Sequence, residues 1–413
     1  MRILNVSSLY PPNVIGGAEF GIQTIAAAIA DAGHDVHVIT LQPPPGIGNV
    51  AAAPSGAVTV HNVPLANIYW PFGASRGTAS RARKMLWHGL DTANAVMGQR
   101  VGRIVRRVRP DVVLTHNLQG FSTAVMPAIK RTGTSLVHVL HDYALICPQT
   151  VMWRNGRGCG TRDERCAGCR VLTTPRWRHL ESVDAVISVS RSLLTFHRLH
   201  GLFTDVPATV IHNALRAGFG IRREVAPRDG EFTFGYLGRV ERSKGIETLL
   251  AAAAELAAAG LRFRVRVAGR GDAGYIDSLR QRWPLDNVEY VGFADAPAFL
   301  ANIDTLVFPS EWLEALGNGV FEAYSQGVPV IGSAVGGIPE LIDHGATGFT
   351  FTPGDFVDLA ARMRRMLTEP QLHRGMAEAA LERAVDFLAS HRAREYLEFL
   401  DTVVDKAPRR RSA

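Results

Sequence analysis

The chain has 413 residues, of which 46% are hydrophobic and 20% are charged, and its formal net charge is +7. This length suits two domains of roughly 200 residues each and makes a single small core unexpected. No uninterrupted apolar run reaches the roughly 20 residues that a membrane-spanning helix needs, and the opening MRILNVSSLYPP has the pattern of a strand, not of a signal peptide. We therefore expect a cytoplasmic protein that does not cross a membrane.

Short apolar segments alternate with longer helical patterns along the chain, which is typical of parallel sheets covered by helices. The first series of predicted strands is Ile3 to Ser8, Val36 to Leu41, Val112 to His116, Leu136 to His141, Ala185 to Val189 and Thr209 to His212. The second series is Thr233 to Leu237, Arg264 to Ala268, Val288 to Val291, Thr305 to Phe308, Val328 to Gly332 and Gly348 to Phe351. The two series predict an α/β protein with two doubly wound parallel-sheet domains, residues 1–215 and 216–390.

The join between these domains is expected in the segment Arg216 to Glu231, which is rich in glycine, proline and charge and poor in periodicity. Residues 391–413 then form a closing helix, predicted from Arg392 to Asp405, and a basic tail with the sequence PRRRSA. The helix can belong to either domain, and packing back on the first one is our expectation.

The first predicted strand leads into Gly16-Gly17-Ala18-Glu19, where a helix begins. Glycine lets a backbone approach a ligand closely, and a helix N-terminus offers unpaired N–H groups, so this turn predicts an anion site. A tight turn without a ligand is the equally simple alternative. The full three-glycine dinucleotide fingerprint is absent, which argues against a nicotinamide-dependent dehydrogenase.

A strongly basic stretch covers residues 76–109, in which Asp91 is the one acidic residue. Its cations are Arg76, Arg81, Arg83, Lys84, Arg100, Arg103, Arg106, Arg107 and Arg109. Many of them stand at helical spacing among apolar residues, which predicts an amphipathic helical hairpin or one long helix with a basic face. A solvated surface is the simplest explanation, and contact with anionic lipid or a phosphorylated acceptor is the alternative. Nucleic acid is not expected, because no recognition motif accompanies the charge.

All four cysteines fall in one segment, which we predict to be an insertion at residues 147–169 of the first domain. They are Cys147, Cys159, Cys166 and Cys169. Because disulfides are disfavoured in a chain without an export signal, a Cys-x2-Cys pair with two more thiols indicates a structural zinc site. An iron–sulfur cluster and free or redox-active thiols remain as alternatives. The role of a metal here would be architectural.

Two strands of the second half end in glycine and cations. The strand that begins at Thr233 is followed by Gly238 and Arg239 and then by Lys244, and the next strand is followed by Gly269. The carboxyl ends of parallel strands form the edge where open α/β sheets bind ligands. Arg239 and Lys244 therefore suit a diphosphate, the first as a planar fork and the second as a point charge.

The segment PSEWLEALGNGVFEAYSQGVPVIGS, residues 309–333, places Glu314 and Glu322 on either side of a turn that contains Gly317 and Gly319. Residues eight apart on a helix point about 80° away from each other, so the two carboxylates need not share a helix face. We predict instead that Glu314 lies in the loop and Glu322 one or two turns into the helix that follows. Carboxylates accept hydrogen bonds from vicinal hydroxyls, so the segment indicates a ligand with phosphates and several hydroxyls.

As an ordered set, these motifs resemble glycosyltransferase family 4, retaining enzymes with the GT-B fold of two Rossmann-like domains that face a central cleft. The resemblance spans nearly the whole chain. It rests on Gly16-Gly17-Ala18-Glu19, His141-Asp142, Gly238-Arg239, Lys244-Gly245, the E-x7-E pair Glu314 and Glu322, Gly336-Gly337-Ile338-Pro339-Glu340, Gly345 and Gly348. It implies the transfer of a sugar from a nucleotide-diphosphate sugar, most simply a UDP- or GDP-sugar, to an acceptor hydroxyl, with no cofactor required for catalysis.

The resemblance also implies residue roles. Arg239 and Lys244 would hold the donor diphosphate, Glu322 the ribose hydroxyls, and Glu314 the hydroxyls of the transferred sugar. His141 would lie near that sugar, with a core histidine at a strand end as the alternative. The implied catalytic set is His141, Glu314, Arg239 and Lys244. The implied donor-binding set is Gly16, Gly17, Gly238, Arg239, Lys244, Gly269, Glu314, Ala315, Leu316, Gly317 and Glu322.

This sequence departs from many relatives directly after Glu314, where they carry a bulky apolar or aromatic residue and this chain has Ala315. The sugar is therefore not predicted. The family implies a place in bacterial polysaccharide, glycolipid or glycoconjugate biosynthesis, with a lipid-linked acceptor at the inner face of the plasma membrane or a small metabolite. The main rivals among enzymes are a glycoside hydrolase and a phosphorylase, and a hydrolase would leave the cations Arg239 and Lys244 without a purpose. A degenerate sugar-nucleotide-binding protein is the alternative from another class.

Overall fold

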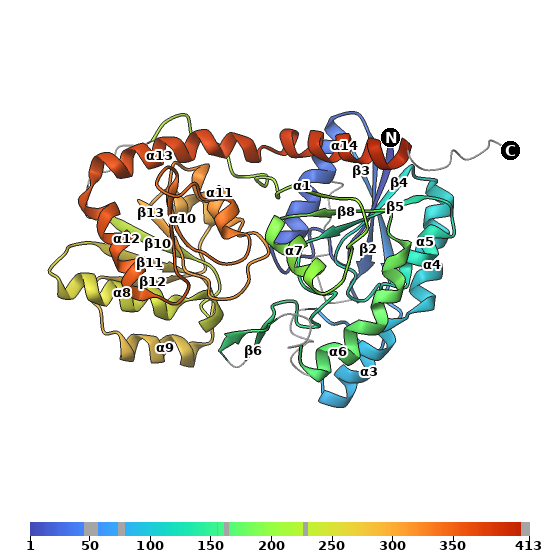
Figure 1. The fold of residues 1–413 in the computed structure, drawn as a ribbon, viewed down its shortest axis with the longest axis horizontal. Coiled ribbons are helices and arrows are strands. Elements are labelled where there is room, and N and C mark those ends of the chain that lie inside the picture. The colour runs from blue at the N-terminus through green and yellow to red at the C-terminus, as the bar shows by residue number, and fades with distance from the viewer. Residues whose placement is uncertain (45–56, 73–78, 155, 161–164, 226–229, 406–413) are drawn as a thin grey trace. The chain divides into compact units, whose positions relative to one another are not determined.

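The computed structural model describes residues 1–44, 57–72, 79–154, 156–160, 165–225 and 230–405 (Figure 1). The chain forms two compact units. The first unit consists of Met1–Thr150, Gly160–Arg216 and Ala389–Ala413, and the second of Val151–Cys159 and Ala217–Leu388. The basic tail, residues 76–78 of the basic stretch, residues 226–229 of the expected join and residues 155 and 161–164 of the cysteine-rich insertion lie outside the described residues.

A seven-stranded parallel sheet forms the centre of the first unit, in the order β3-β2-β1-β4-β5-β8-β9. Its strands are β1 (Arg2–Val6), β2 (Asp35–Gln42), β3 (Val58–Pro64), β4 (Val112–Thr115), β5 (Ser135–Leu140), β8 (Ala185–Ser188) and β9 (Ala208–Val210). The inner strands β4, β5 and β8 are buried along their whole length, which explains their continuous apolar runs. The edge strand β3 is mostly exposed, with Val58 and Val63 buried, and it was not predicted.

The helical elements of the first unit are α1 (Gly17–Asp31), α3 (Arg81–Thr92), α4 (Ala95–Val108), α5 (Val125–Lys130), α6 (Ala167–Thr173), the 3-10 segment η2 (Thr174–Ser182), α7 (Arg191–Leu199) and α14 (Ala389–Asp405). Helix α14, red in Figure 1, packs on α1. Buried side chains of both helices, such as Ile22 and Leu400, join one hydrophobic core with the strands. The closing helix thus belongs to the first unit.

The second unit contains a six-stranded parallel sheet in the order β12-β11-β10-β13-β14-β15. Its strands are β10 (Thr233–Leu237), β11 (Arg264–Ala268), β12 (Val288–Gly292), β13 (Thr305–Phe308), β14 (Val330–Ser333) and β15 (Gly348–Phe351). Its helical elements are η3 (Arg242–Lys244), α8 (Ile246–Ala258), α9 (Ala273–Arg282), α10 (Ala296–Leu300), α11 (Gly319–Tyr324), η4 (Ile338–Glu340), α12 (Phe356–Thr368), α13 (Pro370–Ala384) and η5 (Val385–Phe387). Helices α8 and α12 pack together over a core that includes Phe234 and Leu249.

Every strand predicted above is present, with ends that differ by two residues at most. The expectation of two Rossmann-like doubly wound sheets is therefore confirmed. A short hairpin of β6 (Trp153–Arg154) and β7 (Arg157–Gly158) was not predicted, and its segment groups with the second unit, although the whole cysteine-rich insertion was expected in the first. In the part of the chain that the structure describes, no helix is both long and apolar enough to span a bilayer.

Each sheet has a point where the order of its strands reverses. In the first sheet this point lies between β1 and β4, and in the second between β10 and β13. Open α/β sheets bind ligands outside the carboxyl ends of the strands at such a point. The loops after these four strands therefore position the candidate site residues.

Candidate active site

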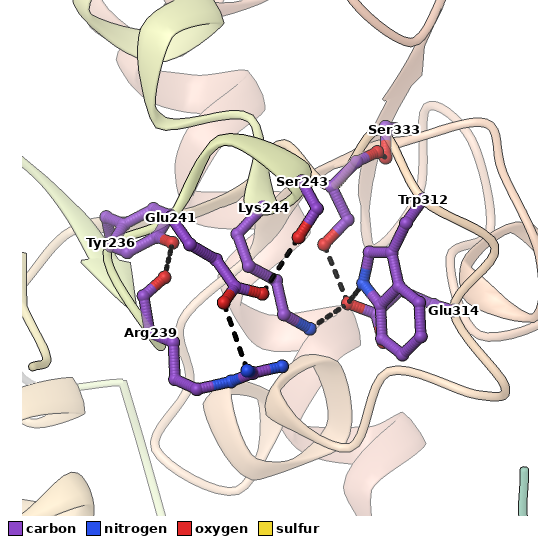
Figure 2. A network of polar contacts seen from close by, with 9 residues as sticks. Tyr236, Arg239, Glu241, Ser243, Lys244, Trp312, Glu314 and Ser333 are labelled. Carbon is purple, nitrogen blue, oxygen red and sulfur yellow. Dashed lines mark hydrogen bonds and ion pairs between the residues drawn. The ribbon is translucent and has the colours of Figure 1, made fainter. Parts of the chain in front are cut away.

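The loops after β10 and β13 are joined in the second unit by Lys244 and Glu314 (Figure 2). The Nζ atom of Lys244 lies 2.5 Å from Oε1 of Glu314. The two side chains are 17% and 9% exposed, so the pair is largely shielded from water. Because β10 and β13 are parallel neighbours, their loops leave the sheet at the same edge, and residues 70 positions apart in sequence meet at the reversal point.

The carboxylate of Glu314 is held by two further donors. Its Oε1 atom accepts hydrogen bonds from Oγ of Ser310 at 2.7 Å and from Nε1 of Trp312 at 2.8 Å. The backbone carbonyl of Ser310 in turn accepts a hydrogen bond from Oγ of Ser333 at 2.5 Å. Nζ of Lys244 also lies 4.5 Å from the centroid of the Trp312 ring, a cation–π distance. The ammonium and the carboxylate are thus preorganised beside one indole ring.

Arg239 presents a second cation at this edge, and its side chain is 62% exposed. Its Nη1 atom lies 3.0 Å from Oε2 of Glu241, whose Oε1 accepts a hydrogen bond from Oγ of Ser243 at 2.8 Å. The hydroxyl of Tyr236 donates to the carbonyl of Arg239 at 2.6 Å, and burial raises the pKa of this tyrosine, so the donor keeps its proton. The backbone at Arg239 is fixed, while its guanidinium is accessible to an anion.

Two glycines allow loops of this site to approach each other. Gly336 has φ +60°, and a Cβ atom there would lie 2.1 Å from the carbonyl oxygen of Glu314. The neighbouring N–H of Gly337 donates to that same carbonyl at 2.9 Å. Gly269 has φ +150°, and a Cβ atom there would lie 1.7 Å from the carbonyl oxygen of Gly238. These predicted residues therefore act through the backbone, where a side chain has no room.

The carboxylates of Glu314 and its neighbour Glu311 have different partners. Oε1 of Glu311 accepts a hydrogen bond from Oγ1 of Thr248 on α8 at 2.8 Å, so this carboxylate is occupied by the helix. Glu322 lies in the first turn of α11, as the turn glycines predicted. Between the two family carboxylates, Leu316 is buried, Ala315 is half-buried, and Gly317 has φ +102°.

In the first unit, the predicted residue His141 directly follows β5 and contacts His116, which directly follows β4. Nε2 of His141 lies 3.0 Å from Nδ1 of His116, and Nε2 of His116 lies 3.0 Å from Oδ1 of Asn5. Burial lowers the pKa of His141 to about 4, and burial together with the facing His141 lowers the pKa of His116 well below its ordinary value. Both rings are therefore neutral near pH 7 and act as hydrogen-bonding groups.

Gly16 and Gly17 lie where α1 begins, with Gly16 as the residue before the first turn. The N–H of Gly16 donates to Oε2 of Glu19 at 2.9 Å, so an acidic side chain of this same motif occupies that donor. Burial raises the pKa of Glu19, and its hydrogen bonds from Gly16 and Ile15 act in the opposite direction. The motif is thus an ordered helix start with a buried carboxyl beside it.

Three of the four cysteines lie in the first unit, whereas Cys159 lies in the second. Cys166 precedes α6 and accepts the backbone N–H of Cys169 at its Sγ, 3.4 Å away. Hydrogen bonding with the Cys147 thiol, followed by burial and the Cys166 thiol, raises the pKa of Cys169. Across the residues described, no group of three or more His, Cys, Asp or Glu side chains is arranged to hold a metal ion. The predicted zinc site therefore stays a prediction.

Sequence reasoning assigned no role to Ser310, Trp312 and His116. Ser310 and Trp312 stand in the loop after a predicted strand, shortly before Glu314, and His116 is the last residue of the predicted strand Val112 to His116. The position at the carboxyl end of a strand was the available signal. What the sequence alone did not indicate is that the serine and indole donors converge on one carboxylate oxygen.

Two family models match the chain and together cover most of it. The model described as Glycosyltransferase Family 4 matches residues 15–217, and the model described as Glycosyl transferases group 1 matches residues 220–383. The glycogen synthase of Mycobacterium tuberculosis is 30% identical over 93% of this chain and 90% of its own length. An uncharacterized 42.6 kDa protein in the cps region of Klebsiella pneumoniae is 28% identical over 83% of this chain and 87% of its own.

Solved structures agree on the fold. The sucrose-phosphate synthase of Thermosynechococcus elongatus superposes with a TM-score of 0.75 at 21% identity, over 98% of this chain and all of that chain. Anabaena Alr3699/HepE in complex with UDP superposes with a TM-score of 0.69 at 20% identity, over 97% and 100% of the two chains. With both family models placed in order and a relative at 30% identity over nine-tenths of its length, the chain belongs to the family 4, group 1 glycosyltransferases, enzymes with the GT-B fold.

Proposed function

We propose that this protein transfers a hexose or related sugar from a nucleotide-diphosphate sugar to an acceptor hydroxyl, with retention of anomeric configuration. The observation that carries the proposal is the Lys244–Glu314 pair at the reversal point of the second sheet, beside the accessible guanidinium of Arg239. Two cations suit a diphosphate, and a fixed carboxylate suits sugar hydroxyls. The similar HepE structure is a complex with UDP, and this likeness supports a nucleotide at the site.

In the proposed reaction, the bond between C1 of the sugar and the leaving phosphate oxygen breaks. The acceptor oxygen bonds to C1 on the same face, and the acceptor proton passes to the leaving phosphate oxygen. Negative charge grows on the diphosphate as the C1–O bond breaks, so Arg239 and Lys244 would stabilise the transition state more than the ground state. Glu314 would orient the sugar through its hydroxyls, Glu322 would bind the ribose, and no cofactor is required.

Thermal unfolding in the presence of UDP-, GDP-, ADP- and dTDP-sugars tests the donor site. A ligand at about 100 times its Kd stabilises the fold by roughly 2.7 kcal/mol, which raises Tm measurably. We expect one nucleotide class to raise Tm, and Lys244→Ala and Glu322→Ala to abolish the shift. Lys130→Ala is a matched control, because Lys130 forms an ion pair with Asp184 at the same 2.5 Å distance in the first unit. A shift that persists in Lys244→Ala, or no shift with any nucleotide, would refute the donor site. Donor binding without sugar transfer to any acceptor would favour the degenerate binding protein.

We also propose that the enzyme meets a lipid-linked acceptor at an anionic membrane, in bacterial polysaccharide, glycolipid or glycoconjugate biosynthesis. The predicted basic stretch forms two helices, α3 and α4. On α3, Trp87 is buried, but Met85 and Leu86 are 70% and 58% exposed, so these two apolar side chains do not pack in a core. Arg81 and Arg83 on the same helix are exposed as well. Apolar side chains flanked by cations match the chemistry of an anionic lipid surface.

Sedimentation with lipid vesicles tests this contact. We expect binding to vesicles that contain phosphatidylglycerol, weaker binding as ionic strength rises, and none to pure phosphatidylcholine. The double variant Met85→Ser, Leu86→Ser should lose the binding. Leu199→Ser on α7 is the control, because Leu199 is 57% exposed on another helix of the same unit. Equal binding by the double variant and the control would contradict the proposed surface.

A further inference from the structure

A cavity of about 180 Å³ opens at the carboxyl edge of the first sheet, and all of its lining residues belong to the first unit. It is lined by the loops after β1, β4 and β5 together with residues of α1, α3 and η2. An apolar cavity of about 150 Å³ is known to accommodate one benzene ring, so this space suits one six-membered ring with its substituents and not a chain of several. The reversal point of the first sheet thus offers a pocket for a single ring.

The charged groups of the cavity are unbalanced toward acid. Among the described residues that line it, there are three carboxyls, those of Glu19, Asp91 and Asp142, against one guanidinium, that of Arg176. Asp91 and Arg176 are 1% and 8% exposed, and Nη2 of Arg176 lies 3.4 Å from Oδ2 of Asp91. A pair joined at this distance, inside the protein, leaves the guanidinium partly neutralised before any ligand enters.

Three histidines of the cavity, His116, His138 and His141, add no positive charge near pH 7. Burial lowers the pKa of His138 to about 3 and that of His141 to about 4. Burial raises the pKa of Asp142 to about 6 and, against the opposing effect of Arg176, that of Asp91 to about 7. Above pH 7 the ionised Asp142 therefore offsets the guanidinium of Arg176, and ionised Asp91 adds a further negative charge.

Two residues that line this cavity carry buried polar atoms with unused hydrogen-bonding capacity. Among the residues the structure describes, Nε of Arg176 has no acceptor and Nδ1 of His141 has no partner, although both are buried. Oδ1 of Asp91 already accepts the N–H of Gly120 at 2.8 Å, which leaves Oδ2 for a ligand and the arginine. A buried N–H without an acceptor is costly, so a ligand that both donates and accepts is favoured. Hydroxyl groups do both.

We infer that the acceptor ring entering this cavity is uncharged, a sugar or cyclitol with hydroxyls and no phosphate, and that Asp91 and Arg176 select it. A phosphate group carries up to two negative charges and needs several cationic or N–H donors, whereas the described lining of the cavity offers one guanidinium beside three carboxyls. A hydroxyl next to the pair can donate to Asp91 and accept from Arg176. This inference rests on the proposed function, because it names the substrate class of the acceptor side.

Saturation-transfer NMR on the full chain tests it with matched probes, myo-inositol against myo-inositol 1-phosphate and glucose against glucose 6-phosphate, at pH 8. We expect the wild type to bind the neutral member of each pair at least ten-fold more tightly. Asp91→Asn removes a charge and keeps the shape, so the selectivity should move toward the phosphorylated member by at least five-fold. Asp184→Asn, at another ion-paired aspartate of this unit, should leave the selectivity unchanged.

Equal or tighter binding of the phosphorylated probes by the wild type would overturn the inference, and so would the absence of binding by both neutral probes. An unchanged selectivity in folded Asp91→Asn would remove the assignment to Asp91. Because breaking a buried pair can unfold the protein, the double variant Asp91→Asn, Arg176→Gln gives a second measurement, in which neutral-ring binding should weaken about ten-fold. The thermal-unfolding experiment with nucleotide sugars is independent of this one. If no nucleotide raised Tm but the protein still preferred the neutral rings, the proposed function would be refuted and the ring selectivity would stand.

Discussion

Nε2 of His141 lies 3.0 Å from Nδ1 of His116, and this contact sets the proton positions on both rings. The amide of Asn5 is oriented by its own bond, because its Nδ2 donates to the carbonyl of His37 at 3.3 Å. Its Oδ1 therefore accepts from Nε2 of His116, which leaves Nδ1 of His116 to accept the Nε2 proton of His141. Nδ1 of His141, a residue that lines the cavity, then remains an unprotonated acceptor.

Replacing Asn5 with leucine should release this arrangement. The buried N–H of His116 would lose its acceptor, so we expect the free energy of unfolding to fall by about 1–3 kcal/mol and His141 to show a mixture of tautomers. Denaturant unfolding and long-range ¹H–¹⁵N spectra of histidine-labelled protein measure the two effects. Asn302→Leu is the control, since Asn302 is exposed and donates to the carbonyl of Ala298. Unchanged histidine spectra in Asn5→Leu would contradict the tautomer assignment.

Glu314→Gln should slow transfer strongly. Glutamine keeps one oxygen for Ser310 and Trp312 but loses the charge that faces Lys244. Since a hydrogen bond to a charged group is worth about 1.5–3 kcal/mol, we expect kcat/KM to fall by roughly 10- to 150-fold. Glu311→Gln, three residues earlier, changes a carboxylate that binds Thr248 and should leave kcat/KM within a factor of about two. Equal losses in the two variants would show that Glu314 has no special role.

The E-x7-E spacing of the family resemblance points to Glu314 and Glu322 and does not include Glu311. Strand ends were also predictable, since buried parallel strands are continuous apolar runs that stop where the loop begins. The cavity was not. Asp91 stood out as the one acid of a basic stretch, but its partner Arg176 lies 85 residues later. They meet because α3, which carries Asp91, packs against α6, and α6 leads directly into η2, which carries Arg176. The exposure of Met85 was likewise invisible, because helical spacing alone does not say which face is buried.

The raised pKa of Asp91 predicts an unusual dependence of stability on pH. In the unfolded chain this carboxyl has a pKa near 3.8, and in the fold it has one of about 7, so between these values the folded state keeps a proton that the unfolded state releases. Its contribution to stability therefore falls as pH rises from about 4 to 7 and is constant above. The lowered pKa values of the buried histidines act in the opposite direction below pH 6.5, so the comparison must be between variants.

We expect Asp91→Asn to lose less stability than the wild type between pH 5 and pH 8, measured by denaturant unfolding at both values. Asp184→Asn should follow the wild type, because the pKa of Asp91 is untouched in it. If the free energy of unfolding changed with pH equally in the wild type and in Asp91→Asn, Asp91 would ionise as readily in the folded protein as in the unfolded chain.

The zinc prediction is decided by metal analysis of protein purified without added metal. We expect about one zinc per chain, bound by the four cysteines of the predicted site. The double variant Cys166→Ser, Cys169→Ser should contain no zinc. Cysteine thiols lose their protons when they bind zinc as thiolates. Removal of the metal by a chelator should therefore yield thiols that can be titrated. The double variant Ser243→Ala, Ser278→Ala controls for the effect of two unrelated substitutions. Four titratable thiols and no zinc or iron in the fresh protein would establish the free-thiol alternative.

Gly336→Ala should disrupt the donor site by displacing the loop that carries Glu314. The new Cβ atom would lie 2.1 Å from the carbonyl oxygen of Glu314, closer than any real contact, and φ +60° adds strain of about 1–2 kcal/mol. The Glu314 loop must then move, and we expect the nucleotide-dependent rise in Tm to disappear. Gly354→Ala separates the two effects, because Gly354 has φ +77° but no atom within 4 Å of the new Cβ. Gly354→Ala should become less stable by the strain energy alone and should keep the nucleotide-dependent rise in Tm. If Gly336→Ala also keeps that rise, the close approach of the two loops does not hold Glu314 in place.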